Sequence, residues 1–479
     1  MPARTRPAAN RPRPRVPDRL EPLTRKQIIG LLIAVTVFVV PLIVDVPDLD
    51  PLGERMLSIF LLAIVLWVSE AIPLVATAVL VIALEVLFIS DQAVLPVPED
   101  ATAYSSFFGA LANPVIVLFL GGFLIADGAE KFQLDKNLAA VLIKPFTGSA
   151  RRTALGLMVI TAVLSMFMSN TATTATMFAV IIPVLGALPE GRPRTGLALS
   201  IPMAANVGGM GTPVGTPPNA IALSALVEAG HAISFLDWML MGIPLMLIIL
   251  LGAWLLICAV FLPGDLTVEL HMDATWRTDT KAVLFYVIAA VTILAWMTES
   301  LHGLSANVVG FLAIVAMLVT RVMTGKDLAG LSWDVLWLVA GGIALGDGVG
   351  ITGLDQWILD LFNWTSMPAL AVVVVMGALG LALSNVISNS AACNLLVPLA
   401  MGLATGVSGL EPVTIAVVLA LACSLGMSLP ISTPPNAIAY ATGEIPTGDM
   451  ARMGLIVGIG GTAVLVLVMP LVWSAMGML

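Results

Sequence analysis

The stretch TPPNAIA at residues 216–222 is repeated letter for letter at residues 433–439. Each copy follows a polar pair, Ser169-Asn170 before the first and Ser388-Asn389 before the second. All four pieces lie within long, uncharged, apolar segments. Polar side chains and helix breakers at membrane depth are costly unless they line a site. We therefore expect the four pieces to build one substrate and ion site between two half-domains.

The composition indicates the class of protein. The chain has 479 residues, of which 59% are hydrophobic and 11% are charged, whereas a soluble domain has about 25% charged residues. We therefore predict an all-α, multi-pass membrane protein. Its 3 cysteines show no disulfide or zinc spacing, and no GxSxG, HExxH or Walker motif occurs. An intramembrane enzyme is therefore disfavoured, and no organic cofactor is expected.

Residues 1–27 form a segment rich in proline and arginine. This segment contains only two acidic residues, Asp18 and Glu21, against eight basic residues: Arg4, Arg6, Arg11, Arg13, Arg15, Arg19, Arg25 and Lys26. The positive-inside rule predicts a disordered tail held in the cytoplasm. Because the rest of the chain is apolar, we expect no nucleic-acid partner for this tail. The first transmembrane helix is assigned to residues 28–50.

Hydropathy predicts simple membrane spans in nine places, at residues 28–44, 56–72, 73–90, 113–128, 235–262, 281–298, 304–323, 334–352 and 449–477. Residues 153–188 and 368–405 are too long for one crossing and are interrupted by the Ser-Asn pairs, which is typical of helical hairpins. Residues 195–228 and 412–444 are broken by glycine and proline, as in the discontinuous helices of transporters. The expected fold has about 11 transmembrane helices plus two re-entrant hairpins.

The two halves of the chain carry the same markers in the same order. Gly121-Gly122 matches Gly341-Gly342, the Ser-Asn pairs match, and the heptapeptides match, at offsets of 220, 219 and 217 residues. An odd number of crossings between equivalent points makes the repeats inverted. Residues 51–262 are assigned to repeat 1, 263–280 to a cytoplasmic loop and 281–479 to repeat 2. Loop charges agree with this topology except in 263–280, which is net acidic.

The hairpin tips are suited to an anion. Each tip begins a new helix whose free backbone N–H groups and dipole attract a carboxylate. Two facing tips fit a substrate with two anionic ends. The expected substrate-binding residues are Ser169, Asn170, Thr171, Ser388, Asn389 and Ser390 at the tips, with Thr216, Pro217, Thr433 and Pro434 at the helix breaks.

The hairpins and broken helices contain no lysine or arginine that could neutralise a dianion. A metal cation is the natural partner, and sodium prefers oxygen ligands. Ser165 and Ser169 lie one helical turn apart, as do Ser384 and Ser388. Carbonyl groups freed at the breaks near Gly215 and Ser432 can complete each shell. Any single serine is explained equally well by helix packing, but the duplication favours a site.

These motifs resemble the divalent anion:sodium symporter family, which contains sodium-coupled dicarboxylate and citrate transporters. The family pattern is Ser-Asn-Thr at each tip and Thr-Pro-Pro-Asn after each break. The chain matches it over about residues 28–479, except for Ser390 in place of threonine. The resemblance implies a homodimer in which a mobile transport domain moves as an elevator against a scaffold. It implies sodium sites formed by Ser165, Ser169, Asn170 and Gly215, and by Ser384, Asn389 and Ser432, with substrate carboxylates at the tips.

We expect a sodium-coupled symporter of C4-dicarboxylates (succinate, malate, fumarate). It would lie in the lipid of a plasma membrane, most simply a bacterial inner membrane, with its N-terminus in the cytoplasm. A sodium-independent dicarboxylate exchanger and a carrier of citrate, 2-oxoglutarate or sulfate remain as alternatives. Ser390 lacks a methyl group relative to threonine, so the pocket is expected to be slightly larger. The acids Glu70, Glu299, Asp127 and Asp347 have no assigned role.

Overall fold

The computed structural model describes residues 23–478 except 189, 265, 269–273, 362–363 and 365–366. Over these residues every regular element is a helix, which confirms the all-α prediction. Most of the predicted basic tail, and part of the predicted loop 263–280, lie outside the described residues. The tail prediction also extends too far, because α1 (Arg25–Ile43) begins before residue 28. Thr24 and Gln27 form a capping box that starts the helix there.

Eight stretches of the described chain are helical, long and apolar enough to span a membrane. They are α1, α2 (Pro51–Ser69), α4 with α5 (Tyr104–Lys131), α11 (Phe235–Val260), α12 (Thr280–Met297), α16 (Trp333–Ile351), α18 (Ala369–Val386) and α22 with α23 (Thr447–Ala475). Shorter apolar helices include α3 (Leu74–Phe88), α14 (Ala306–Val319) and α20 (Pro412–Ser424). The chain is thus a multi-pass membrane protein, and the count of about 11 crossings stays a prediction.

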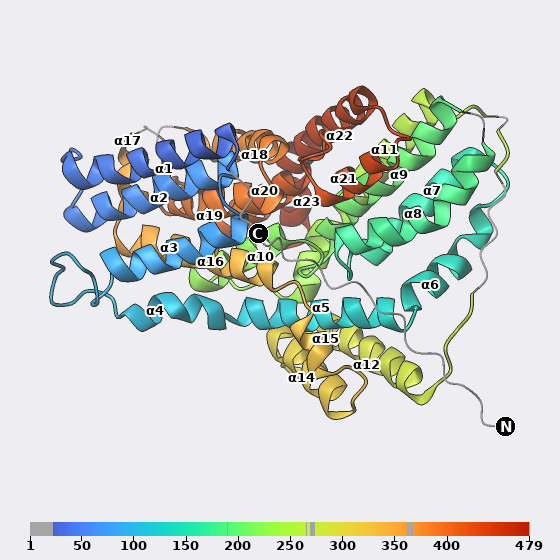
Figure 1. Ribbon diagram of the computed structural model, residues 1–479, viewed down its shortest axis with the longest axis horizontal. Helices are drawn as coiled ribbons and strands as arrows, with labels where there is room; N and C mark the ends of the chain where they lie inside the picture. The colour runs from blue at the N-terminus through green and yellow to red at the C-terminus, as the bar shows by residue number, and fades with distance from the viewer. Residues whose placement is uncertain are drawn as a thin grey trace.

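Each stretch with a central Ser-Asn pair forms two helices that lie side by side. Residues 153–188 contain most of α7 (Ala150–Ser165) and α8 (Asn170–Ala187) (Figure 1). Residues 368–405 contain α18 and α19 (Asn389–Gly406). Ser169 and Ser388 cap the second helix of each pair, accepting hydrogen bonds from Ala172 N at 3.1 Å and Ala391 N at 3.2 Å.

Each repeated heptapeptide begins a helix after a break. In the first half, α9 (Arg192–Gly208) and the short helix η3 (Gly209–Gly211) are followed by α10 (Pro217–Glu228). In the second half, α20 is followed by α21 (Pro434–Ala441). The prolines stand in the first helical turn, where a missing N–H costs no hydrogen bond. The prolines therefore start the new helix after each break.

Helices of each half pack against helices of the other half. Helix α10 of the first half packs on α19 and α20 of the second, while α21 of the second half packs on α8 and α9 of the first. Helix α5 (Pro114–Lys131) packs on α14, and its counterpart α16 packs on α3. Such reciprocal packing is what two copies related by a pseudo-twofold axis produce. The hairpins and broken helices thereby form one body, called here the hairpin body, made of α7–α11 and α18–α23.

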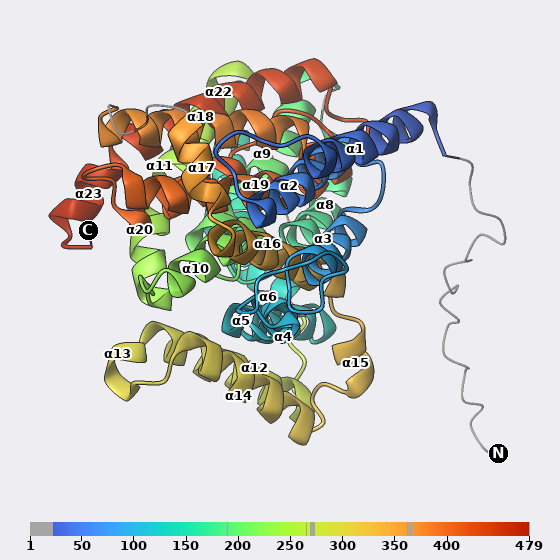
Figure 2. The ribbon, with the colours of Figure 1, turned by 90° about the vertical axis from the view of Figure 1, so that its left-hand side faces the viewer.

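Most of the remaining helices form a second group around α5 and α16. In Figures 1 and 2, α12 and α14 lie on the opposite side of α5 from the hairpin body. Close approach relies on glycine, because a Cβ at Gly121 would strike the Gly310 backbone and one at Gly341 would strike Ala78. This second group, called here the outer group, contains α1–α5 and α12–α16.

An ion pair fixes the end of α5 to the short helix α15 (Gly325–Ala329). Lys131 Nζ lies 2.7 Å from Asp327 Oδ2. Partial burial opposes ionisation of Asp327, but hydrogen bonds from Lys131 and Thr324 outweigh it and hold the pKa of Asp327 below its ordinary value. Since both side chains are partly exposed, we expect the pair to position α15 more than to stabilise the fold.

Two amphipathic helices were not assigned from the sequence. They are α6 (Leu134–Leu142) and α17 (Leu354–Leu361), which begin at equivalent positions 220 residues apart. Each follows a residue in the left-handed region, Gln133 with φ 60° and Gly353 with φ 67°. Both helices are too short and too polar to register as membrane spans. Their matched positions extend the internal repeat beyond the motifs seen in the sequence.

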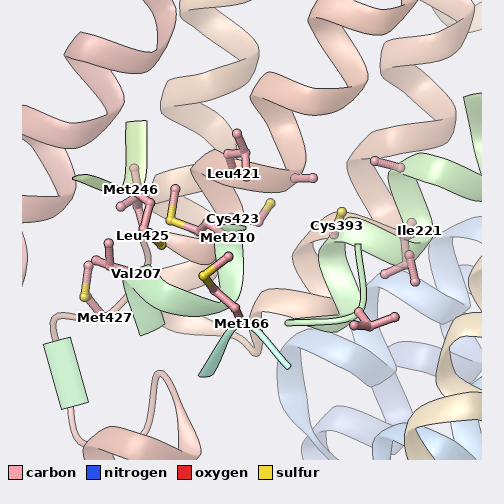
Figure 3. Close-up of a cluster of buried hydrophobic side chains, with 14 of the residues drawn as sticks. Met166, Val207, Met210, Ile221, Met246, Cys393, Leu421, Cys423, Leu425 and Met427 are labelled. Atoms are coloured by element: carbon pink, nitrogen blue, oxygen red, sulfur yellow. The ribbon is translucent and has the colours of Figure 1, made fainter. Parts of the chain in front are cut away.

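Methionine and cysteine side chains fill the space around the breaks. Figure 3 shows Met166 and Met210 of the first half close to Leu425 and Met427 of the second, and all four are buried. Unbranched methionine adapts to irregular gaps such as those left by interrupted helices. The polar groups of the two breaks are therefore surrounded by an apolar core.

Candidate substrate and cation site

Polar atoms converge at the first hairpin tip. Ser165 Oγ donates to Asn170 Oδ1 at 2.6 Å or to Ala205 O at 2.8 Å. A Cβ added at Gly209 would lie 2.6 Å from Asn170 Oδ1 and 3.1 Å from Gly215 O. One at Gly215 would strike Gly209 O. Ser165, Asn170 and Gly215, all predicted as ligands, therefore meet at one point together with the unpredicted carbonyl of Gly209.

Asn219 braces this break. Its Nδ2 donates to Gly209 O at 2.9 Å and Thr212 O at 2.8 Å. The Thr212 hydroxyl in turn donates to Met166 O on the hairpin. Asn219 fixes the carbonyl of Gly209 from behind, so it is a positioning residue. The sequence interpretation gave it no role, although the signal was present, since this asparagine belongs to the repeated heptapeptide.

The second tip repeats the main contact. Ser384 Oγ donates to Asn389 Oδ1 at 2.7 Å or to Cys423 O. Asn436, the counterpart of Asn219, donates from Nδ2 to Met427 O at 2.7 Å and Leu429 O at 3.0 Å. The serine–asparagine contact and its asparagine brace thus occur in both halves.

The Ser432 side chain bonds to backbone groups of the hairpin and of the break, and not to Asn389. Its hydroxyl donates to Asn385 O at 3.1 Å and accepts from Leu429 N at 3.1 Å. Asn385 Oδ1 accepts from Ser428 N at 2.9 Å. The Ser432 side chain therefore ties the break to the hairpin, which leaves its backbone carbonyl for the predicted role as a cation ligand.

Burial differs among the predicted residues of the site, and the predicted cation ligand Ser169 is exposed. Ser165, Gly215, Ser384 and Ser432 are buried. Ser169, Thr171 and Pro434 are exposed, whereas Asn170, Ser388, Asn389, Ser390 and Pro217 are half-buried. Thr216 and Thr433 are buried behind the prolines. Small buried oxygens suit a cation, and the exposed tips remain accessible to a solute.

The breaks also contact the opposite half. Asn206 on α9 donates from Nδ2 to Thr433 Oγ1 and to Asn436 Oδ1, both at 3.2 Å. Cys393 Sγ on α19 lies 3.5 Å from Pro218 O. Each break therefore lies beside the other half's elements. Asn206 was not singled out from the sequence, because its partners lie more than 200 residues away.

The polar set of this site is neutral. The two hairpins and both breaks contain no charged residue, and the described residues hold no cluster of three or more His, Cys, Asp or Glu side chains that could bind a metal ion. Hydroxyl, amide and carbonyl oxygens are the ligands that hard cations prefer. A cation held there would supply the positive charge that an anionic solute needs.

The chain matches the family described as sodium:sulfate symporter transmembrane region over residues 25–479. The sodium-dependent dicarboxylate transporter SdcS of Staphylococcus saprophyticus is 30% identical over 490 residues, covering 92% of this chain and 90% of the relative. SdcS of Staphylococcus aureus strain NCTC 8325 is 30% identical over 497 residues, covering 94% and 93%.

Two solved structures share the fold at low identity. The YdaH transporter of Alcanivorax borkumensis aligns with a TM-score of 0.55 at 14% identity, covering 87% of this chain and 98% of that one. MtrF of Neisseria gonorrhoeae aligns with a TM-score of 0.54 at 13% identity, covering 85% and 94%. At such identities the likeness concerns the fold alone. The family match over nearly the whole chain confirms the resemblance, and the protein belongs to the divalent anion:sodium symporter family of membrane transporters.

Proposed function

We propose that the protein is a sodium-coupled symporter of C4-dicarboxylates such as succinate, malate and fumarate. The observation that carries the proposal is the duplicated, charge-free contact of Ser165 with Asn170 and of Ser384 with Asn389. The printed function of the SdcS relatives supports the same substrate class and the same ion. No organic cofactor is part of the proposal.

Sodium would bind first in each half. In the first half, Ser165, Ser169, Asn170 and Gly215 would supply the oxygens, with the Gly209 carbonyl added by the geometry. In the second half, Ser384, Asn389 and Ser432 would do so. Asn170 Oδ1 and Asn389 Oδ1 each accept from a serine in the hairpin before the tip, so a bound cation would lock the tip to that helix. Ordering the tip prepares the substrate site.

The substrate would bind where the hairpin tips are accessible. Backbone N–H groups at the start of α8 and α19 would receive its carboxylates, assisted by Ser169, Asn170 and Thr171 at one tip and by Ser388, Asn389 and Ser390 at the other. Thr216, Pro217, Thr433 and Pro434 would form the adjoining wall. The sodium ions would offset the dianion's charge, which makes binding of the two solutes mutually dependent.

The division into two groups of helices supports an elevator movement. Within the hairpin body, helices of one half pack on helices of the other half. The hairpin body contacts the outer group mainly where α10 and α19 pack on α16. We propose that the hairpin body moves and that the outer group stays fixed in the lipid as the dimerisation scaffold. The proposed setting is a bacterial inner membrane with the N-terminus in the cytoplasm.

Competition defines the substrate class. Purified protein in liposomes would take up labelled succinate in the presence of an excess of unlabelled malate, fumarate, citrate, 2-oxoglutarate or sulfate. We expect malate and fumarate to suppress uptake strongly, because both place two carboxylates at the spacing of succinate. Suppression by sulfate alone would replace the proposal with an inorganic-anion carrier. Uptake that requires dicarboxylate inside the vesicles, and no sodium, would identify an exchanger.

A further inference from the structure

A pocket of about 420 Å³ lies outside the substrate and cation site, between α10, α16, α17 and α19. Its lining includes Glu228, Asp347 and Asp355 together with His231. Among its described lining residues none is lysine or arginine. The proposed function uses none of these groups. An acidic pocket between apolar helices requires its own explanation.

Two of the carboxyl groups contact each other. Glu228, at the end of α10, and Asp347 on α16 line the same pocket and interact with each other. Glu228 Oε1 also accepts from Asn113 Nδ2 and from Ser224 Oγ, both at 3.0 Å. Two carboxylates at one site repel each other, and a proton shared between them relieves the repulsion. The contact therefore favours one bound proton.

A third acid lies behind the pair. Glu85 on α3 is fully buried, and neither of its oxygens has a hydrogen-bond partner among the described residues. It packs against α16, since a Cβ at Gly348 would lie 2.6 Å from Glu85 Oε1. Its charge and that of Asp347 repel each other. An ionised carboxylate without partners is very costly to bury, so Glu85 adds to the demand for protons.

The elements around the pair carry few other charged groups. Helix α3 contributes Glu85, α17 contributes Asp355 and the segment after α10 contributes His231. Helix α19 has no charged residue, and α5 contributes the neutral Asn113 to the contact. Among the described residues that line the pocket, only His231 could supply a positive charge, and His231 and Glu228 are both exposed. Loss of the shared proton would therefore leave mutually repelling carboxylates without a nearby counter-charge.

We infer that Glu228 and Asp347 form a proton-binding site that joins the hairpin body to the outer group. Glu228 belongs to α10, whereas Asp347 and Asn113 belong to or precede helices of the outer group. With the proton bound, α10 is held against α16 and the start of α5. Without it, repulsion between the carboxylates disfavours this arrangement. The site is separate from the proposed sodium ligands, and only its consequence for transport rests on the proposed function.

Infrared spectroscopy of the purified full-length protein in nanodiscs tests the site directly. Raising the pH from about 6 to about 9, where free succinate and ordinary surface acids are already ionised, should remove a protonated-carboxyl band from the native protein. Glu228→Gln and Asp347→Asn should each abolish this change, because each removes one member of the pair. Glu130→Gln and Asp334→Asn, at exposed acids on α5 and α16, should leave it intact.

Thermal unfolding of the same samples provides a second reading. The native protein should lose stability over this pH interval, and Glu228→Gln should reduce that loss at least by half. An unchanged band and an unchanged pH slope in both pair variants would overturn the inference. Repeating the titration in sodium and in choline separates a proton from a cation, since a midpoint that moves with sodium would mean that sodium occupies the pair instead. Neither reading uses transport, so failure of the proposed function would not affect the result.

Discussion

The two hairpin–break units carry the same central contact but are braced differently. In the first, the hairpin carbonyl of Met166 receives the Thr212 hydroxyl. In the second, the equivalent carbonyl of Asn385 receives the Ser432 hydroxyl. The serine–asparagine contact is duplicated, while the hydroxyl that bonds this carbonyl comes from a different position in each half. This difference supports our proposal that the serine–asparagine contact is the functional unit.

The brace asparagines differ in the same way. Asn436 Oδ1 accepts from Asn206 of the other half, whereas the buried Asn219 Oδ1 has no hydrogen-bond partner among the described residues. The position equivalent to Asn206 is Cys423, a much weaker donor. The second break is thus tied across the repeat by amide hydrogen bonds, whereas among the described residues the first break has the weaker contact of the Cys393 thiol with Pro218 O. We expect the first unit to rearrange more easily.

Removing the shared contact should have the largest effect. Asn170→Ala and Asn389→Ala should each lower sodium-driven uptake by about 100-fold or more, the scale lost when groups that hold a metal are removed. Uptake into proteoliposomes measures this. Asn137→Ala, at an asparagine of α6 that bonds to Thr275, is the matched control. Substantial uptake by either variant would refute the site assignment for that half.

Closing the space beside each contact should have the next largest effect. A Cβ at Gly215 would strike the Gly209 carbonyl, and one at Gly426 would strike Ser384. Overpacking of this kind costs about 1–3 kcal/mol, so each alanine variant should raise the sodium concentration for half-maximal uptake by about 10-fold. Gly186→Ala has open space and should behave as the native protein. Equal sodium dependence in all three variants would argue against cation sites at the breaks.

Removing the hydrogen bonds that Asn206 makes to the other half should have a moderate effect on stability. Asn206→Ala removes the donor to Thr433 and Asn436, and a buried group left without a partner costs about 1–3 kcal/mol. The melting temperature should fall, and added sodium should recover less stability than in the native protein. Asn206→Asp, which keeps the shape but loses the donor, should resemble the alanine variant. Native-like melting in both would show that the second break does not depend on this tie.

Exchanging the third residue of the tips should have the smallest effect. Ser390→Thr adds one methyl group and Thr171→Ser removes one, and a buried methylene is worth about 0.8 kcal/mol. The ratio of citrate to succinate inhibition constants should therefore change about fourfold at most, in opposite directions. Inhibition measurements on labelled uptake would check this. An identical ratio in both variants would mean that these residues do not contact the substrate.

The features found from sequence are those encoded locally. The all-α class and the Ser-Asn pairs within 153–188 and 368–405 follow from hydropathy and duplication, and the structure brings Ser165 and Asn170 to 2.6 Å. Their functional role stays a prediction. The features missed depend on tertiary contacts: Asn206 meets Thr433 across 227 residues, and Glu228 meets Asp347. Helices α6 and α17 were missed because short amphipathic helices resemble polar loops in a hydropathy scan.

The central claim is that a sodium ion accompanies the dicarboxylate through two neutral sites. Uptake of labelled succinate into proteoliposomes with an imposed inward sodium gradient tests it most directly, with potassium replacing sodium in the matched vesicles. The account predicts accumulation in sodium and little more than leakage in potassium. Equal uptake under both gradients would contradict it.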